Sequence, residues 1–97
     1  MRNRKETIND MKAGFQKEPV ERKLFIIAGE IWQNWRNPYF GAEPYIKAMY
    51  AMESIDDMYG FDEGHMIVRY FLSNASTWRG EKAREIKAEL KAMLSRR

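Results

Sequence analysis

Apolar residues recur at spacings of three and four along most of this 97-residue chain. That spacing places side chains on one face of an α-helix, whereas a half-buried β-strand would alternate apolar and polar residues. No segment shows strict alternation or runs of β-branched residues, and no repeat of about 20 to 50 residues is visible. The pattern therefore predicts an all-α fold without strands.

Proline, glycine and small polar residues divide the periodic pattern into segments. A chain of this length forms one small domain, and short connections between amphipathic segments favour a single compact bundle of four to five helices. We expect residues 1–97 to be that domain, with a frayed basic end over residues 1–5. The expected helices cover residues 6–17, 19–36, 44–59, 62–74 and 81–95.

Local signals place the ends of the third and fourth expected helices. Pro44 suits a first helical turn, and Gly60 suits the left-handed position just beyond a helix end. Asp62 is a plausible N-cap for the next helix. The short connection also invites a helix-turn-helix interpretation, but the second helix would begin with acidic residues and would offer Arg69 as its only lysine or arginine. Repulsion from phosphates makes it a poor reader of a DNA groove.

The apolar stripes predict which side chains meet in the core. The second expected helix should contribute Leu24, Ile27, Ala28, Ile31, Trp32 and Trp35. The fourth should point Met66, Ile67, Tyr70 and Phe71 inward, with Val68 and Leu72 widening its apolar arc. The last should bury Ala83, Ile86, Leu90, Met93 and Leu94.

Five aromatic residues lie between positions 32 and 45, and they have two interpretations. Aromatic side chains are good core anchors, and Tyr and Trp are also enriched at partner hot spots. Trp32 and Trp35 continue an apolar stripe, so we assign them to the core. The predicted partner surface lies in the loop that follows, the next helix start and a later turn, and consists of Tyr39, Phe40, Tyr45 and Trp78.

The composition excludes several kinds of chemistry. Without cysteine the chain can form no disulfide, no thiolate nucleophile and no cysteine-based metal site. The basic N-terminal region lacks the apolar stretch of about 7 to 15 residues that a signal peptide needs, and no run of about 18 apolar residues occurs. With 44% hydrophobic and 32% charged residues, we expect a soluble cytoplasmic protein that uses no membrane and no cofactor.

Charge is distributed unevenly along the chain. Residues 1–23 carry seven basic and four acidic side chains, residues 24–78 three and seven, and residues 79–97 seven and three. Basic ends beside an acidic middle suit self-association, an extended partner or nucleic acid. Against nucleic acid, three glutamates lay an acidic stripe along the last expected helix. The surface for this alternative would be Arg2, Arg4, Lys5, Arg79, Lys82, Arg84, Lys87, Lys91, Arg96 and Arg97.

No arrangement of titratable residues indicates catalysis or metal binding. His65 is the only histidine, and we expect it to face solvent near a helix start, because acid-base catalysis needs a partner that the sequence does not show. Glu53, Asp56 and Asp57 could share a helix face, but their order does not follow a calcium loop. A solvated acidic face is their expected role. We predict no catalytic residue, no metal ligand and no enzymatic activity.

Three short motifs stand out in the second half of the chain. They are Pro44-Tyr45, Tyr59-Gly60 and the run YFLSNASTWRG at residues 70–80. On these motifs the chain from Pro44 onward resembles small uncharacterised proteins encoded in prophages and mobile elements of Gram-positive bacteria. The resemblance implies an accessory phage-type protein in a bacterial cytoplasm, and it carries over no activity, cofactor or site residue.

The leading hypothesis is a small, non-enzymatic helical accessory protein of phage type that acts by contact with a protein partner or by self-association. The alternative is a backbone-directed nucleic-acid-binding protein that uses its two basic ends. Exposure of Tyr39 and Phe40 is the observation that separates a contact surface from a core role for the aromatic loop.

Overall fold

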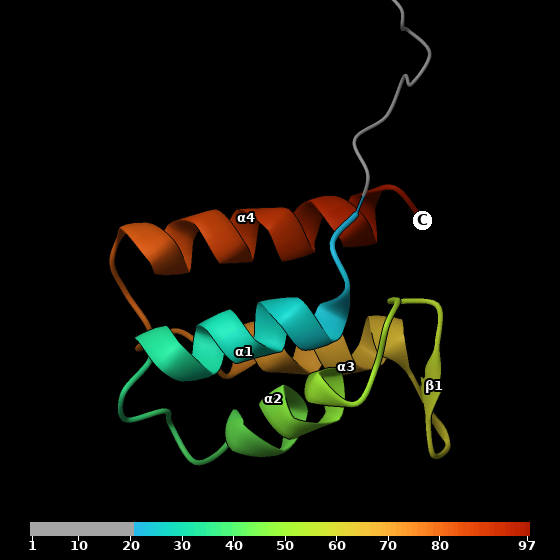
Figure 1. Cartoon of the computed structure of the whole chain (residues 1–97), viewed down its shortest axis with the longest axis horizontal. Helices are drawn as coiled ribbons and strands as arrows, with labels where there is room; N and C mark the ends of the chain where they lie inside the picture. The colour runs from blue at the N-terminus through green and yellow to red at the C-terminus, as the bar shows by residue number, and fades with distance from the viewer. Residues whose placement is uncertain (1–20) are drawn as a thin grey trace, which may run out of the picture.

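The structure, a computed structural model, describes residues 21–97. The expected helix at residues 6–17 and the cations Arg2, Arg4 and Lys5 lie outside the described residues. The described part is mostly helical, with one small antiparallel sheet (Figure 1). Its elements are α1 (Leu24–Asn34), α2 (Glu43–Tyr50), β1 (Met58–Tyr59), β2 (Asp62–Glu63), α3 (Gly64–Ser73) and α4 (Glu81–Ser95).

Helix α1 lies in the middle of the helical arrangement. It packs against α2 and α4, and α3 packs against the same two helices. In Figure 1, α4 runs above α1 and α2 runs below it. The buried residues within the described part are all hydrophobic, so removal of apolar surface from water is the main stabilising term for this packing. No helix within residues 21–97 combines the length and hydropathy needed to cross a membrane.

Most of the predicted core positions are buried. Helix α1 buries Leu24, Ile27, Ala28 and Ile31. Helix α4 follows its predicted bounds and buries Ala83, Ile86, Leu90 and Met93, with Leu94 partly buried against them. The core prediction is wrong for Trp32, Met66 and Tyr70, which are 45%, 38% and 42% exposed. The buried arc of α3 is narrower than the sequence suggested, because only Gly64, Ile67, Val68 and Phe71 reach the interior.

Three aromatic rings form one side of the core. The rings of Trp35 and Trp78 stack with centroids 5.7 Å apart, and Phe71 meets each of them edge-on at 6.4 Å and 6.2 Å. The indole Nε1 of Trp78 donates a hydrogen bond of 2.9 Å to Oδ1 of Asn34. The cluster thus joins the end of α1, the last turns of α3 and the turn before α4, and the N–H donor of buried Trp78 is satisfied.

The third expected helix ends nine residues early, at Tyr50 rather than Tyr59. The chain instead turns back to the start of α1, where the carbonyl groups of Glu53 and Met52 accept hydrogen bonds from the amides of Leu24 (2.9 Å) and Phe25 (3.0 Å). The first amides of a helix have no acceptor within the helix itself. Continuing α2 would remove these two acceptors, so a long-range contact overrides the local helical pattern.

A two-stranded hairpin occupies the region where helix was expected, so the prediction of no strands is wrong. Met58 pairs with Glu63 and Tyr59 with Asp62 in antiparallel register. Gly60 has the expected positive φ, +65°, but it serves in the two-residue hairpin loop and not beyond a helix end. Asp62 lies in β2, and Glu63 takes the N-cap position of α3 without a side-chain capping bond. The helix-turn-helix interpretation therefore fails as well.

Candidate protein-contact surface

The loop between α1 and α2 presents two aromatic rings to solvent. Tyr39 and Phe40 are 45% and 77% exposed, and their ring centroids lie 4.9 Å apart. The loop leads directly into α2, because the amides of Ala42 and Glu43 donate to the carbonyl groups of Tyr39 (2.8 Å) and Phe40 (3.3 Å). The rings are thus held on an ordered turn at the helix start.

Helix α3 extends this surface with Tyr70. The rings of Tyr45 and Tyr70 are 5.5 Å apart, with Tyr45 half-buried against the core and Tyr70 exposed. Asn74 lies between the two parts. Its Nδ2 donates to the Tyr70 carbonyl at 2.8 Å, and its Oδ1 lies beside Gly41, which is also covered by the Tyr39 ring. We call the four side chains Tyr39, Phe40, Tyr45 and Tyr70 the aromatic face.

Gly41 permits this close approach. A Cβ built at that position would overlap the Tyr39 ring and lie 2.9 Å from Oδ1 of Asn74. The absence of a side chain lets the loop pack against the end of α3, so residues far apart in sequence share one surface. The sequence hinted at this arrangement only through a glycine between the loop aromatics and Pro44.

One predicted member of the contact surface does not belong to it. Trp78 is 2% exposed and lies in the core with Trp35 and Phe71, so it has almost no surface to offer a partner. Tyr70 takes its place, although the sequence placed Tyr70 inside. A signal was present: a tyrosine at the edge of a helical apolar arc can bury its ring and keep its hydroxyl in water.

The titratable residues near the hairpin serve as structural links. The carboxylate of Asp57 accepts hydrogen bonds from the amides of Glu53 (3.0 Å) and Ser54 (3.1 Å). Asp56 instead pairs with Arg97 at 3.0 Å, and this guanidinium, followed by His65, holds the pKa of Asp56 below its usual range. The predicted acidic helix face therefore does not exist.

His65 is half-buried, in contrast to the expected solvent-facing position. Its Nε2 lies 3.4 Å from Oδ1 of Asp56, and its Nδ1 lies 3.8 Å from Oε1 of Glu63. Within the described part its Nε2 has no well-aligned hydrogen bond. Across residues 21–97, no group of three or more acidic, histidine or cysteine side chains could hold a metal ion.

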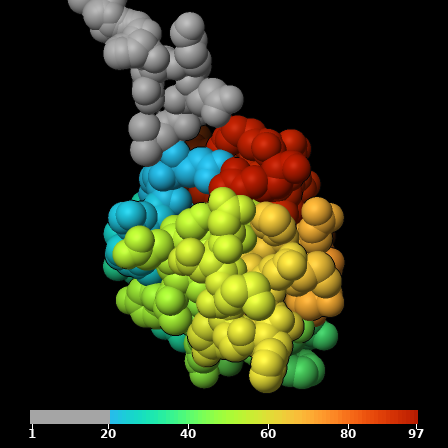
Figure 2. All heavy atoms as spheres, turned by 90° about the vertical axis from the view of Figure 1, so that its right-hand side faces the viewer, coloured from blue at the N-terminus to red at the C-terminus, as the bar shows by residue number. Residues whose placement is uncertain are grey.

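Several of the cations proposed for nucleic-acid binding are engaged by carboxylates. Arg96 and Arg97 bind Glu21 at 3.0 Å and 2.9 Å, and Nζ of Lys82 lies 3.8 Å from Glu30. Figure 2 shows the face where the blue start of the described chain, the yellow-green segment before the hairpin and the red C-terminal residues meet. These charges are therefore less available to phosphates than the sequence suggested.

Lys87 belongs to a different group of cations. Its Nζ donates to the Trp78 carbonyl at 2.7 Å and lies 5.9 Å from the centre of the Trp78 ring. Burial lowers the pKa of Lys87, and repulsion from Lys91 and Arg79 lowers it further. Positive charge is thus concentrated on the side of α4 next to the Trp78 turn.

Comparisons with known proteins assign this chain to no family. The resemblance to prophage proteins remains a prediction, because none of the comparisons bears on it. Neither the models of protein families, nor the curated proteins, nor the solved structures gave a match to this chain.

Proposed function

We propose that this protein is a non-enzymatic helical module that binds a protein partner through the aromatic face. The observation that carries the proposal is the grouping of Tyr39, Phe40 and Tyr70 at the surface beside half-buried Tyr45, with rings in contact in pairs. Aromatic side chains supply a large contact area and lose little conformational entropy on binding. Exposed apolar groups that gather in one patch mark interaction sites more often than isolated ones do.

The local structure supports binding without a large rearrangement. Two backbone hydrogen bonds hold the loop against α2, and the loop packs closely on Asn74 at the end of α3 through Gly41. A surface that is already ordered pays less entropy when a partner binds than a mobile loop does. The tyrosine hydroxyl groups can add polar contacts at the edge of the apolar area.

The test compares partner capture by matched variants. Wild type, the double variant Tyr39→Ala/Phe40→Ala, Tyr70→Ala and the control Tyr50→Ala are immobilised and exposed to lysate of the source organism. Tyr50 is 61% exposed but lies outside the aromatic face. We expect a protein that is retained by wild type and Tyr50→Ala and is at least about tenfold weaker on the two aromatic-face variants, as loss of a hot spot predicts.

Circular dichroism of each variant separates lost binding from lost folding. The proposal is overturned if the aromatic-face variants are folded and retain the same proteins as wild type. It is equally overturned if they unfold while Tyr50→Ala does not, because the rings would then be core residues.

A second candidate function, backbone-directed nucleic-acid binding, is favoured by one observation. Lys87 and Lys91 lie four residues apart in α4 and therefore share one face of the helix, beside the turn that carries Trp78 and Arg79, and such concentrated positive charge attracts phosphates. Anisotropy of a labelled DNA duplex should then show binding at about 50 mM salt that weakens by tenfold or more at about 200 mM. Lys91→Gln should reduce the salt slope by about one unit. Absence of binding at the lower salt would exclude this function.

A further inference from the structure

The tip of the hairpin carries a phenylalanine that stands clear of the rest of residues 21–97. Phe61 is fully exposed, and its neighbours Met58 and Tyr59 are 57% and 46% exposed. A fully exposed aromatic ring gives the fold none of the stabilisation that its burial would provide. Phe61 contributes no packing to the described part of the chain, and its position at the tip suits a contact with another molecule.

The hairpin that carries Phe61 is well anchored at its base. The amide of Gly64 donates to the Asp57 carbonyl at 2.8 Å, and the Asp57 carboxylate holds the preceding turn through two amides. Gly64 also packs directly on the backbone of Ile55. The tip therefore presents Phe61 from an ordered base, which lowers the entropy cost of inserting it into a pocket.

A pocket of suitable size opens at the other end of α1. It has a volume of about 350 Å³ and is lined by Trp32, Trp35, Arg36, Asn37, Pro38 and Glu43. This volume is at the lower end of the range for ligand pockets, about 300 to 1,000 Å³, which suits a single aromatic side chain. The exposed Trp32 ring, which the core does not use, forms one wall.

The two sites together offer one pair of opposite charges. The hairpin from Met58 to Glu63 carries two acidic residues, Asp62 and Glu63, and no lysine or arginine. The pocket has Arg36 on its exposed wall. Its acidic member, Glu43, stands in the first turn of α2, where a carboxylate already interacts favourably with the helix dipole. A tip that inserts Phe61 brings an adjacent carboxylate, that of Asp62, toward a guanidinium.

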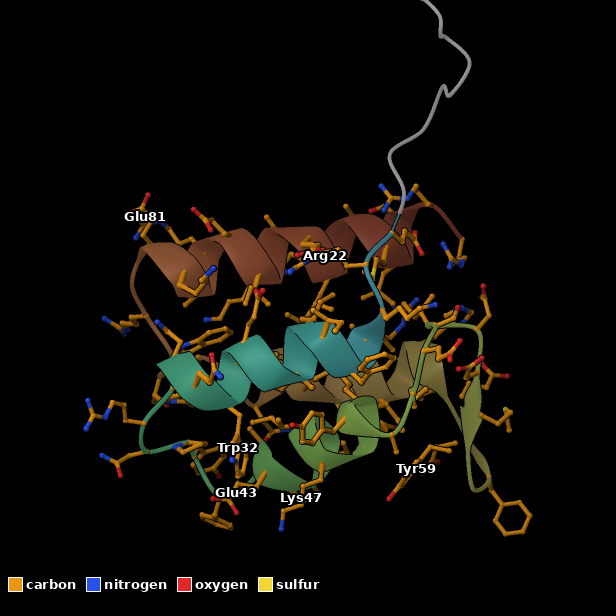
Figure 3. The ribbon with its side chains drawn as sticks, in the orientation of Figure 1. Arg22, Trp32, Glu43, Lys47, Tyr59 and Glu81 are labelled. Carbon is orange, nitrogen blue, oxygen red and sulfur yellow. The ribbon has the colours of Figure 1, made fainter. Side chains whose placement is uncertain are left out.

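The two sites cannot meet within one molecule. The hairpin follows the turn whose Met52 and Glu53 carbonyl groups accept from the first amides of α1, whereas the pocket is built from the last turn of that helix and the loop beyond it. Eleven residues of helix separate them by about 16 Å along the axis. Figure 3 shows the same separation, with Tyr59 on the hairpin and Trp32 and Glu43 toward the opposite end.

We propose that two copies of this chain associate head to tail, with Phe61 of one copy inserted into the Trp32 pocket of the next and Asp62 facing Arg36. The interface is heterologous, so each dimer retains one free tip and one free pocket, and association continues into longer chains or closes into a ring. An interface of one inserted side chain and one ion pair is weak, with a dissociation constant on the order of high micromolar to millimolar. The aromatic face shares no residue with this head-to-tail contact.

Complementation between variants tests the direction of the contact. Sedimentation velocity of the full chain is measured from about 10 μM to about 1 mM, the range of such affinities. We expect the weight-average mass of wild type to rise toward at least twice the monomer mass. Phe61→Ser lacks the inserted ring, and Arg36→Glu places a carboxylate that repels Asp62 on the wall of the pocket, so each should stay monomeric alone. Their equimolar mixture should form dimers and nothing larger.

A charge swap and a matched control complete the experiment. The double variant Asp62→Arg/Arg36→Glu should recover the association of wild type, whereas Tyr50→Ser, an exposed aromatic outside both sites, should associate as wild type does. The proposal is overturned if wild type remains monomeric at the highest concentration, if Phe61→Ser associates normally, or if the mixture of tip and pocket variants stays monomeric. Far-ultraviolet circular dichroism confirms that each variant is folded.

Discussion

Trp78 combines three stabilising contacts in one residue. Its ring stacks on Trp35, its Nε1 donates to Asn34, and its backbone carbonyl accepts from Lys87. Phe40 has the same aromatic character but stands largely in water. The difference lies in what surrounds each ring, so substitution should separate a core role from a surface role at the level of the single residue.

We expect Trp78→Ala to lower the free energy of unfolding by about 3 to 5 kcal/mol, as removal of a buried aromatic side chain does. Phe40→Ala should change it by about 0.5 kcal/mol or less, because its ring contributes little burial. Urea denaturation followed by circular dichroism measures both. Equal destabilisation by the two changes would contradict the assignment of Phe40 to the surface.

Two glycines offer a matched pair for backbone packing. A Cβ at Gly64 would overlap the carbonyl group of Ile55, whereas a Cβ at Gly29 would meet only a Tyr50 ring carbon at 3.9 Å. Gly64→Ala should therefore destabilise the fold by about 1 to 3 kcal/mol through overpacking. Gly29→Ala, in the interior of α1, should stabilise it by roughly 0.5 to 1 kcal/mol. Thermal melts of the two variants should move in opposite directions.

At the scale of elements, the segment between α2 and α3 does more than connect two helices. Its carbonyl groups accept from the first amides of α1, and its own turn is held by the Asp57 carboxylate. The hairpin then leads directly into α3, with Glu63 of β2 at the N-cap position. Because α2 ends early, this segment can hold the first turn of α1 and lead directly into the first turn of α3.

Removal of the Asp57 carboxylate tests this role. We expect Asp57→Ala to cost about 0.5 to 2 kcal/mol, the range measured when a side chain that caps backbone amides is lost. Hydrogen exchange at the amides of Glu53 and Ser54 should accelerate more than exchange in α4. Asp62→Ala is the control, because Asp62 is exposed in β2. If both variants behaved alike, the cap would have no special role.

At the scale of the whole molecule, ion pairs connect segments that are distant in the chain. Arg22 binds Glu30 of α1 and Glu89 of α4, each at 2.8 Å, and Figure 3 shows Arg22 between these two helices. Arg97 similarly connects Glu21 with Asp56. The Arg22 guanidinium holds the pKa of Glu30 below its usual range, and Arg97, followed by Arg96, does the same for Glu21.

These shifts give stability a defined dependence on pH. A carboxylate whose pKa is lower in the folded state binds protons more readily when the chain unfolds, so its contribution is present above the unfolded value, near 4.3 for glutamate, and is lost as pH falls through the folded value. The urea midpoint should therefore decrease below about pH 5. Arg22→Met should be less stable at pH 7 and lose less on acidification. The sites are partly solvated, so the effect should be modest, and an identical pH profile for both proteins would contradict it.

The helical spacing of apolar residues predicted that α1, α3 and α4 are helices, and for α4 it also predicted the bounds and the buried positions. This works because a helix that buries one side carries apolar residues along that side. The sequence also identified Tyr39 and Phe40 as candidates for a surface. Three further features depended on tertiary contacts: the early end of α2, the exchange of Trp78 for Tyr70 in the aromatic face, and the exposure of Trp32. Each depends on neighbours supplied by a distant segment, such as the carbonyl groups that meet the start of α1 or the rings that enclose Trp78. The apolar periodicity of a helix predicts how much of the helix is buried. Only the tertiary contacts decide which edge of its apolar stripe is covered.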